Sequence, residues 1–203
     1  PSGFNYIYSL DYLNSSQSAY NPLTNVDSSV GIGDTAARSR QAQGFQPPQS
    51  GFYTYICVYI CKVGSPTDNL TIKLYTNSTN TPSGTLVVDY AGSTSDSISG
   101  TVGGSTLDTN FRLVPFKLDP PVYLVGGSTY HLSVERSGAV YAINYYLLGV
   151  DSLANYSLGN RSSYNSGTAT WTAQVDDLSF YVFSASSDWK VIPRRMWSYR
   201  RVG

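Results

Sequence analysis

The sequence predicts an all-β protein built from two antiparallel sheets that pack face to face. The most informative stretch is 52–63, FYTYICVYICKV, in which nearly every residue is β-branched or aromatic and Lys62 is the one charge. Such a run favours a strand that lies at the centre of a sheet or is covered on both faces. Only 13% of the residues are charged, Glu135 is the only glutamate, and no amphipathic helical pattern exceeds about two turns.

The stretch 52–63 is followed by turn residues and then by a second strand pattern. Residues 64–69 read Gly-Ser-Pro-Thr-Asp-Asn, in which the proline presets φ and the Asp or Asn tolerates a left-handed conformation. Residues 70–75 alternate between apolar and polar, which predicts one buried and one solvent-facing side. The residues expected in the core are Leu70, Ile72 and Leu74, and those expected in water are Thr71, Lys73 and Tyr75. We expect the two strands to pair as a hairpin at the heart of the domain.

The beginning of the chain is less regular. Scattered aromatic residues and turn residues break any long pattern in 1–42, which we expect to form an N-terminal arm or the first strands. Within it, 4–13 could supply one strand. The segment 35–43, TAARSRQAQ, fits either a short helix or an extended segment.

Beyond residue 75, short strand patterns alternate with turn clusters. We expect a turn at 77–84, a long loop or edge strand at 92–109, and a polar loop at 152–167. Pro115 restricts the strand 110–118 to an edge or a bulge. The other predicted strands are 85–90, 122–125, 129–135, 140–150, 169–173 and 177–183. Eight or more strands at a spacing of about 8–12 residues predict a two-sheet sandwich, and a long chain of this kind is most often a jelly roll.

The charges divide the chain unevenly. Residues 1–188 carry 8 basic and 13 acidic groups, whereas 189–203 carry 5 basic groups and no acid. We therefore predict three parts: the arm or first strands at 1–42, a jelly-roll sandwich at 43–184, and a basic aromatic tail at 185–203. The charge of the tail suggests that it docks on a partner.

Cys57 and Cys61 are the only cysteines and lie on one predicted strand. Their side chains point the same way but are separated by about 13 Å, whereas a disulfide needs Cα atoms within about 7 Å. We expect two buried free thiols, which favours synthesis in a reducing cytosol. No stretch of 18 apolar residues occurs, so no membrane span is predicted.

The sequence contains no convincing set of catalytic or metal-binding side chains. The single histidine, His131, has no second His and no nearby Cys, which argues against a zinc site and favours a structural or surface role. Asp176 and Asp177 precede the last strand, with one expected to face inward and one outward. They suit a backbone cap or a structural Ca²⁺ site with loop carbonyls better than acid–base catalysis. We therefore expect no catalytic residues, no enzyme activity and no cofactor other than this possible calcium.

The tail interleaves aromatic and basic side chains. A nucleic-acid interface is disfavoured by the acidic body of the chain, and a solvated tail is an alternative. We favour an anchor on a partner protein, because aromatic residues, Met and Arg are enriched at interfaces. The tail residues expected to make this contact are Trp189, Lys190, Arg194, Arg195, Met196, Trp197, Arg200 and Arg201.

Three segments resemble a jelly-roll module that recurs in tailed-phage structural and tail-fibre proteins and in secreted bacterial proteins. They are KVGSPTDNLTIKLYTNSTNTPSGTLV within 51–87, the Trp-Thr-Ala at 171–173, and the Asp-Leu-Ser-Phe at 177–180. The resemblance covers roughly 44–183 and looks like a carbohydrate-binding type of sandwich. It implies a non-catalytic domain used in assembly or attachment.

Two functions follow as hypotheses. The first is a structural subunit of a virus particle, such as a capsid decoration protein or a tail or fibre component, on the virion surface. Its arms would contact other virion subunits in a homo-oligomer. The alternative is a glycan-binding attachment module of a phage or of a secreted, extracellular bacterial protein. Its sugar-binding residues would be the loop aromatics and their neighbours Tyr156, Tyr164, Asn155, Asn160 and Asn165.

Overall fold

The computed structural model describes residues 17–20, 26–88 and 100–184, with side chains described from residue 26 onward. In these ranges the chain is all-β, with two single 3-10 turns at Ala36–Arg38 (η3) and Gly104–Thr106 (η5). The strands, in chain order, are β1 Gln17–Tyr20, β2 Ser28–Ile32, β3 Arg40–Phe45, β4 Gly51–Val63, β5 Asn69–Ser78, β6 Thr81–Leu86, β7 Gly100–Gly103, β8 Arg112–Leu124, β9 Tyr130–Arg136, β10 Tyr145–Asp151, β11 Arg161–Asn165, β12 Thr170–Ala173, β13 Asp177–Leu178 and β14 Phe180–Ser184.

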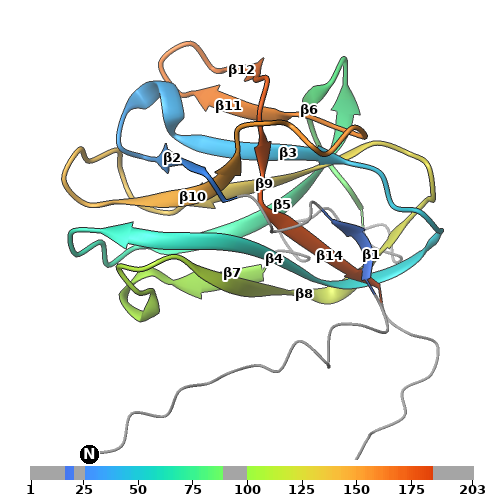
Figure 1. The fold of residues 1–203 in the computed structure, drawn as a ribbon, viewed down its shortest axis with the longest axis horizontal. Coiled ribbons are helices and arrows are strands. Elements are labelled where there is room, and N and C mark those ends of the chain that lie inside the picture. Colours follow the sequence, from blue (N-terminus) through green and yellow to red (C-terminus); the bar gives the residue numbers. More distant parts are fainter. Residues whose placement is uncertain (1–16, 21–25, 89–99, 185–203) are drawn as a thin grey trace, which may run out of the picture.

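These strands form two antiparallel sheets of seven strands each. Sheet A has the order β1-β14-β4-β10-β13, with β8 paired to β4 and β2 paired to β10. Sheet B has the order β12-β11-β3-β9-β5-β6, with β7 paired to β5. Figure 1 shows β11, β12 and β6 on one side of the molecule and β4, β8 and β14 on the other.

The core lies between the two sheets and is built by the period-two alternation of their strands. On β5, Leu70, Ile72 and Leu74 are each at most 1% exposed, as the sequence predicts. On β4, Ile56, Val58 and Ile60 face them from sheet A and are equally buried. The core cluster draws on both sheets, so the sandwich predicted from the sequence is confirmed at this level.

The strand β4 is central to sheet A, as predicted. It pairs with β8 along one edge and with β14 and β10 along the other. Cys57 and Cys61 alternate with its core residues, are each 4% exposed, and are free thiols. The predicted pair of buried, unbridged cysteines is therefore confirmed.

The predicted hairpin between β4 and β5 is wrong, because the two strands belong to different sheets. The connection is fixed at Asp68, whose carboxylate accepts hydrogen bonds from the Arg136 guanidinium of β9 at 2.8 and 2.9 Å. The backbone oxygen of Asp68 accepts from the Tyr146 hydroxyl of β10 at 2.7 Å and from the Gly104 amide at 3.0 Å. Because Arg136 lies in sheet B and Tyr146 in sheet A, these contacts hold the turn where the chain crosses from one layer to the other.

Sheet B curls into a half-barrel, because β6 pairs with β5 and also lies against β12 and β3. The concave face of sheet B, which β6 covers, carries small residues that let β6 come close to β3 and β12. They are Ala42, Ser133 and Ser162, and all three are fully buried. Tyr75 also lies on this face and is 6% exposed. The prediction that Tyr75 faces water is therefore wrong, because the curl of the sheet covers its second side.

Several predicted boundaries shift in the structure. The cluster at 77–84 contains a tight turn whose central residues Thr79 and Asn80 have φ of 49° and 64°, and β6 begins directly after it. β8 continues through the predicted turn at 119–121, with residues 118–121 bulging opposite Thr54. Pro115 lies on this strand, which pairs only with β4 among the described strands, so its predicted edge position is confirmed. The segment 161–165, expected as part of a loop, is strand β11.

The segment 28–45 belongs to both sheets: β2 joins β10 in sheet A and β3 joins β9 and β11 in sheet B. The segment 35–43 combines the two alternatives expected for it, a short 3-10 turn followed by a strand. β1 pairs with β14, which places Gln17 opposite Phe183. The predicted strand at 4–13 and the basic tail at 189–203 lie outside the described residues.

Candidate functional site

A row of chemically distinctive side chains crosses the concave face of sheet B. Strand register places Trp171 of β12 opposite Tyr164 of β11, Tyr164 opposite Arg40 of β3, and Arg40 opposite Glu135 of β9. The rings of Tyr164 and Trp171 are 5.0 Å apart, and the Arg40 guanidinium lies over the Tyr164 ring at 4.7 Å. Because the four side chains come from neighbouring strands, the sheet itself holds them in line. We call them the aromatic–cationic row.

Glu135 anchors the buried end of this row. Its carboxylate accepts hydrogen bonds from the Tyr75 hydroxyl at 2.9 Å and from the Ser133 hydroxyl at 3.2 Å. Arg40 and Lys73 each approach it to 3.6 Å. Glu135 is thus held as a structural carboxylate between two cations.

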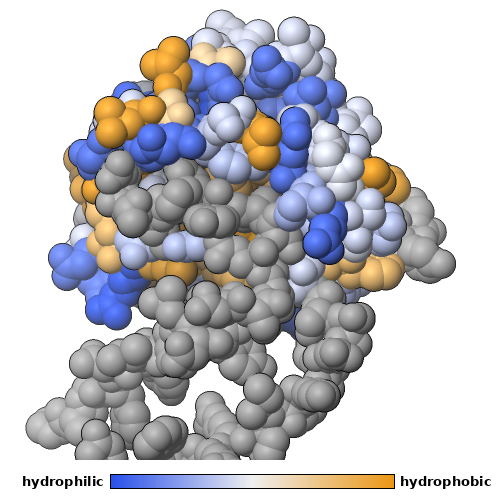
Figure 2. Space-filling model, turned by 45° about the vertical axis from the view of Figure 1, so that its right-hand side comes forward, coloured by the Kyte–Doolittle hydropathy of each residue, from blue (hydrophilic) through white to orange (hydrophobic). Residues whose placement is uncertain are grey.

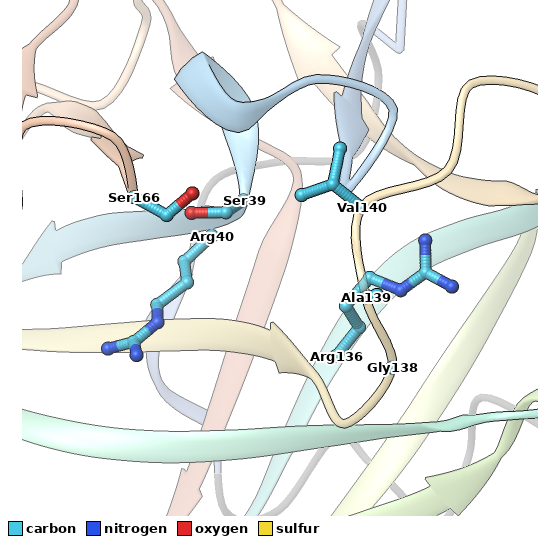
Figure 3. Close-up of a pocket in the computed structure, with 7 residues that line it drawn as sticks. All are labelled: Ser39, Arg40, Arg136, Gly138, Ala139, Val140 and Ser166. Atoms are coloured by element: carbon cyan, nitrogen blue, oxygen red, sulfur yellow. The ribbon is translucent and has the colours of Figure 1, made fainter.

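A pocket of 320 Å³ adjoins the row at Arg40. Its lining residues come from three segments and are Ser39, Arg40, Arg136, Gly138, Ala139, Val140 and Ser166. Figure 3 shows Ser39, Ser166 and Arg40 on one side and the loop after β9 on the other. A volume of this size is within the range of about 300–1,000 Å³ that small-molecule sites occupy.

His131 lies on the same face of sheet B but is buried at 1% exposure and donates to or accepts from Asn77 through Nε2 at 2.8 Å. Burial lowers its pKa to about 4, so the ring is neutral at physiological pH. Its Nδ1 and the Ser162 hydroxyl are buried polar atoms without a hydrogen-bond partner in the described chain. Of the two roles predicted for His131, the structure supports a buried structural histidine and not a surface histidine.

Tyr156, expected as an exposed sugar-stacking residue, packs into the core. Its ring meets Phe180 edge-on at 5.2 Å, and its hydroxyl accepts the amide hydrogen of Gln46 at 3.1 Å. Burial raises the pKa of this hydroxyl. The structure thus gives Tyr156 a packing role, because the loop that carries it folds back onto the sandwich.

The other predicted sugar-binding residues do not gather around Tyr156. Tyr164 lies in the aromatic–cationic row, on the far side of sheet B from the core. The amide of Asn155 donates to Asp151 at 2.8 Å, Asn160 donates to the Gln174 carbonyl at 3.3 Å, and Asn165 accepts from the Gly167 amide at 2.8 Å. Of the five predicted residues, the structure places only Tyr164 in the candidate site.

Asp176 and Asp177 face different environments, as predicted. Asp176 is ion-paired with Arg161, whose Nε lies 2.7 Å from the carboxylate. Asp177 is 1% exposed and accepts from Gln43 at 2.9 Å and from the Tyr156 amide at 3.0 Å; burial raises its pKa. Within the described part of the chain, no group of three or more His, Cys, Asp or Glu side chains is placed to hold a metal ion.

A second surface feature lies on the outer face of sheet A. Phe52 of β4 and Tyr123 of β8 are cross-strand partners whose rings meet edge-on at 5.3 Å. Phe52, Tyr55, Tyr123 and Val125 are 38–48% exposed. We call these four residues the aromatic corner. Figure 2 shows that apolar residues elsewhere on the visible surface are interspersed with polar ones.

Sequence reasoning missed Arg40, Ser39, Ser166 and the loop 138–140 as site residues. No local signal marks them, because they are separated by about a hundred residues and meet only through the pairing of β3 with β9 and β11. In the sequence, Trp171 is part of a strand pattern and Glu135 is the only glutamate, and neither feature by itself indicates a site.

Comparison of the chain with protein-family models, with curated proteins and with solved structures finds no match. The resemblance to a phage or carbohydrate-binding module is therefore carried by the sequence pattern alone. None of the helices in the described residues is long and apolar enough to cross a membrane.

Proposed function

We propose that this protein is a non-enzymatic structural subunit of a tailed-phage particle, a capsid decoration or a tail or fibre component on the virion surface. The sandwich is the displayed body, and the terminal segments connect it to other virion subunits and to further copies of the chain. The observation that carries this proposal is the position of the chain ends relative to the aromatic corner.

The first and last described strands, β1 and β14, are neighbours in sheet A. Because β1 pairs with β14, Gln17 and Phe183 are neighbours in sheet A, and Ser184 lies opposite Tyr53 beside Phe52. The first and last described residues, Gln17 and Ser184, therefore lie close together near Phe52 of the aromatic corner. Exposed aromatic side chains with adjoining chain ends are what an inter-subunit contact needs.

Charge complementarity supports a second copy of the chain as one partner. Residues 189–203 carry a net charge of +5, whereas 1–188 carry a net charge of −5. A tail that crosses to the body of the next subunit brings its arginines to acidic groups and its tryptophans to the aromatic corner. Closed rings are the expected symmetry.

The connectivity supports the jelly-roll type of sandwich. Eight strands are arranged in the spatial orders β2-β10-β4-β8 and β3-β9-β5-β6, and consecutive strands change sheet except at the β5–β6 pair. The first strand thus pairs with the last, and each later strand is placed as in two successive Greek keys. Jelly rolls of this kind occur in viral capsids and in lectins, which suits both candidate functions.

The test of the assembly proposal is light scattering coupled to size exclusion, on the full chain and on a 1–187 truncation. We expect oligomers from the full chain and monomers from the truncation. The double variant Phe52→Ser and Tyr123→Ser is expected to shift the full chain to monomers, whereas Val175→Ser, at an 89% exposed site between β12 and β13, is expected to leave oligomers intact. Monomers from the unaltered full chain would overturn assembly through the tail.

Glycan attachment is the second candidate function, and the aromatic–cationic row favours it. A partly exposed Trp–Tyr pair flanked by an arginine supplies stacking surfaces and directional donors, which are the groups that sugar recognition uses. In this case the protein acts on the surface of a virion or as part of a secreted protein.

A further inference from the structure

We infer that the pocket beside Arg40 binds an acidic, N-acylated sugar of the sialic acid class. This inference rests on the second candidate function, glycan attachment, and names its ligand and its site. It is independent of the assembly proposal, because the pocket lies on sheet B and the aromatic corner on sheet A.

Arg40 is the cation of this region whose donors remain available. Arg136 uses its guanidinium on Asp68 and on the carbonyls of Gly33 and Asn144, and Arg161 is similarly occupied by Asp176. Arg40 makes a ring contact with Tyr164 and loose 3.6 Å ion pairing to Glu135, but no hydrogen bond within the described chain. Its planar fork can therefore receive a carboxylate in the paired geometry that arginine prefers.

The two serines of the pocket act as acceptors. The Ser39 hydroxyl donates to the Tyr164 carbonyl at 3.1 Å, and the Ser166 hydroxyl donates to the Ala36 carbonyl at 3.4 Å. With their hydrogens directed at backbone oxygens, both hydroxyl oxygens offer lone pairs to a ligand. Groups of that kind pair with the hydroxyl hydrogens of a sugar.

The opposite wall of the pocket is apolar and favours a ligand that carries an N-acetyl group. Ala139 and Val140 line it, and Val140 is 40% exposed. Figure 3 shows the Arg40 side chain extending away from Val140, with Ser39 and Ser166 between the two. In a sialic acid the carboxylate and the N-acetyl group lie on opposite sides of the ring. The carboxylate then meets Arg40, the ring hydroxyls meet the serines, and the acetyl methyl packs on Val140. Trp171, further along the row, is placed to stack on the next sugar of a chain.

The test is isothermal titration and saturation-transfer NMR on the full chain with four probes. They are N-acetylneuraminic acid, glucuronic acid, N-acetylglucosamine and lactose. We expect N-acetylneuraminic acid to bind at least tenfold more tightly than the other three, because each of them lacks the carboxylate, the acetyl group or both. Equal binding of all four probes would overturn the inference.

Arg40→Gln and Val140→Asp are expected to weaken binding of N-acetylneuraminic acid by about tenfold or more. The first removes the partner of the carboxylate, and the second removes the apolar surface that contacts the acetyl methyl. Arg38→Gln is the matched control, since Arg38 is already paired with Asp34 in the same turn, and it is expected to bind normally. Thermal melts establish that each variant is folded. Unchanged affinity in folded Arg40→Gln overturns the inference.

A broader glycan array separates this inference from the function on which it rests. Binding of a neutral glycan that is lost in Trp171→Ala, with no response to N-acetylneuraminic acid, overturns the inference and leaves glycan attachment standing. No binding to any glycan overturns both, and the assembly proposal is then judged by light scattering alone.

Discussion

The ion pair between Asp68 and Arg136 is expected to be the most costly single interaction to break in this fold. The side chains are only 14% and 7% exposed, and the carboxylate receives two charge-assisted hydrogen bonds from the guanidinium. Asp68→Ala leaves the guanidinium buried with only the carbonyls of Gly33 and Asn144 as partners. Removal of one member of a buried pair costs about 3–5 kcal/mol, and we expect a loss of that size.

The assay is equilibrium urea unfolding followed by circular dichroism, with the free energy of unfolding extrapolated to water. Asp119→Ala is the matched control, because its partner Lys117 and Asp119 itself are both more than half exposed, so the change should have little effect. The double variant Asp68→Ala with Arg136→Met should lose less than the sum of the single losses, by about 1–3 kcal/mol, because no charge is left uncompensated. A loss for Asp68→Ala no greater than that for Asp119→Ala would refute the reasoning.

The same pair has a pH signature. Burial by itself raises the pKa of Asp68, but the hydrogen bonds from Arg136 and from the Gly138 amide outweigh it, and the pKa lies below the ordinary value of 3.8. The unfolded state then binds the proton first, so this stabilisation is fully present above pH 4 and is lost as the pH falls through the lower folded value.

Three further predictions concern the interior. Burial lowers the pKa of His131 from 6.5 to about 4, so stability should fall by about 3 kcal/mol as the pH drops through this window, and His131→Gln should flatten the urea-measured profile. A steeper profile in the variant would contradict this. Burial raises the pKa of the Cys57 thiol to about 12 and also raises that of Cys61, so a thiol reagent at pH 8 should label neither until the protein is denatured. Rapid labelling of the native protein would count against the packing of that face. Gly104→Ala places a Cβ 1.9 Å from the Tyr146 hydroxyl oxygen, and we expect a loss of roughly 1–3 kcal/mol in thermal or urea melts.

The pattern of side chains predicted strands more reliably than it predicted their partners. Alternation identified the buried face of β5, because burial of every second residue follows from the pleat itself. It could not tell that β4 and β5 lie in different sheets, because turn residues serve a hairpin and a crossing between layers equally well. The position of Asp68 between Arg136 and Tyr146 decided this, and those partners are about 70 residues away in sequence.

Of the residues that form the candidate site, the sequence predicts only Tyr164 as a binding residue. The sequence predicts Tyr164 as a loop aromatic, yet it lies on strand β11, beside Arg40 and Trp171. Tyr156 was selected by the same criterion and is a packing residue. An aromatic residue in a polar segment carries no information about which way its loop folds. The sequence therefore could not tell that Tyr156 packs against the core while Tyr164 lies in the candidate site.

By itself, then, the sequence determined that the protein is all-β, that its sheets are antiparallel, which face of β5 is buried, and that its two thiols are free. These properties follow from short-range rules, namely backbone propensity and the alternation of side chains along a strand. Only the tertiary structure decided the curl of sheet B, the burial of Tyr75, the pairing of β1 with β14, and the pocket beside Arg40. Each of these depends on contacts between strands distant in sequence, and such contacts leave no local pattern to read.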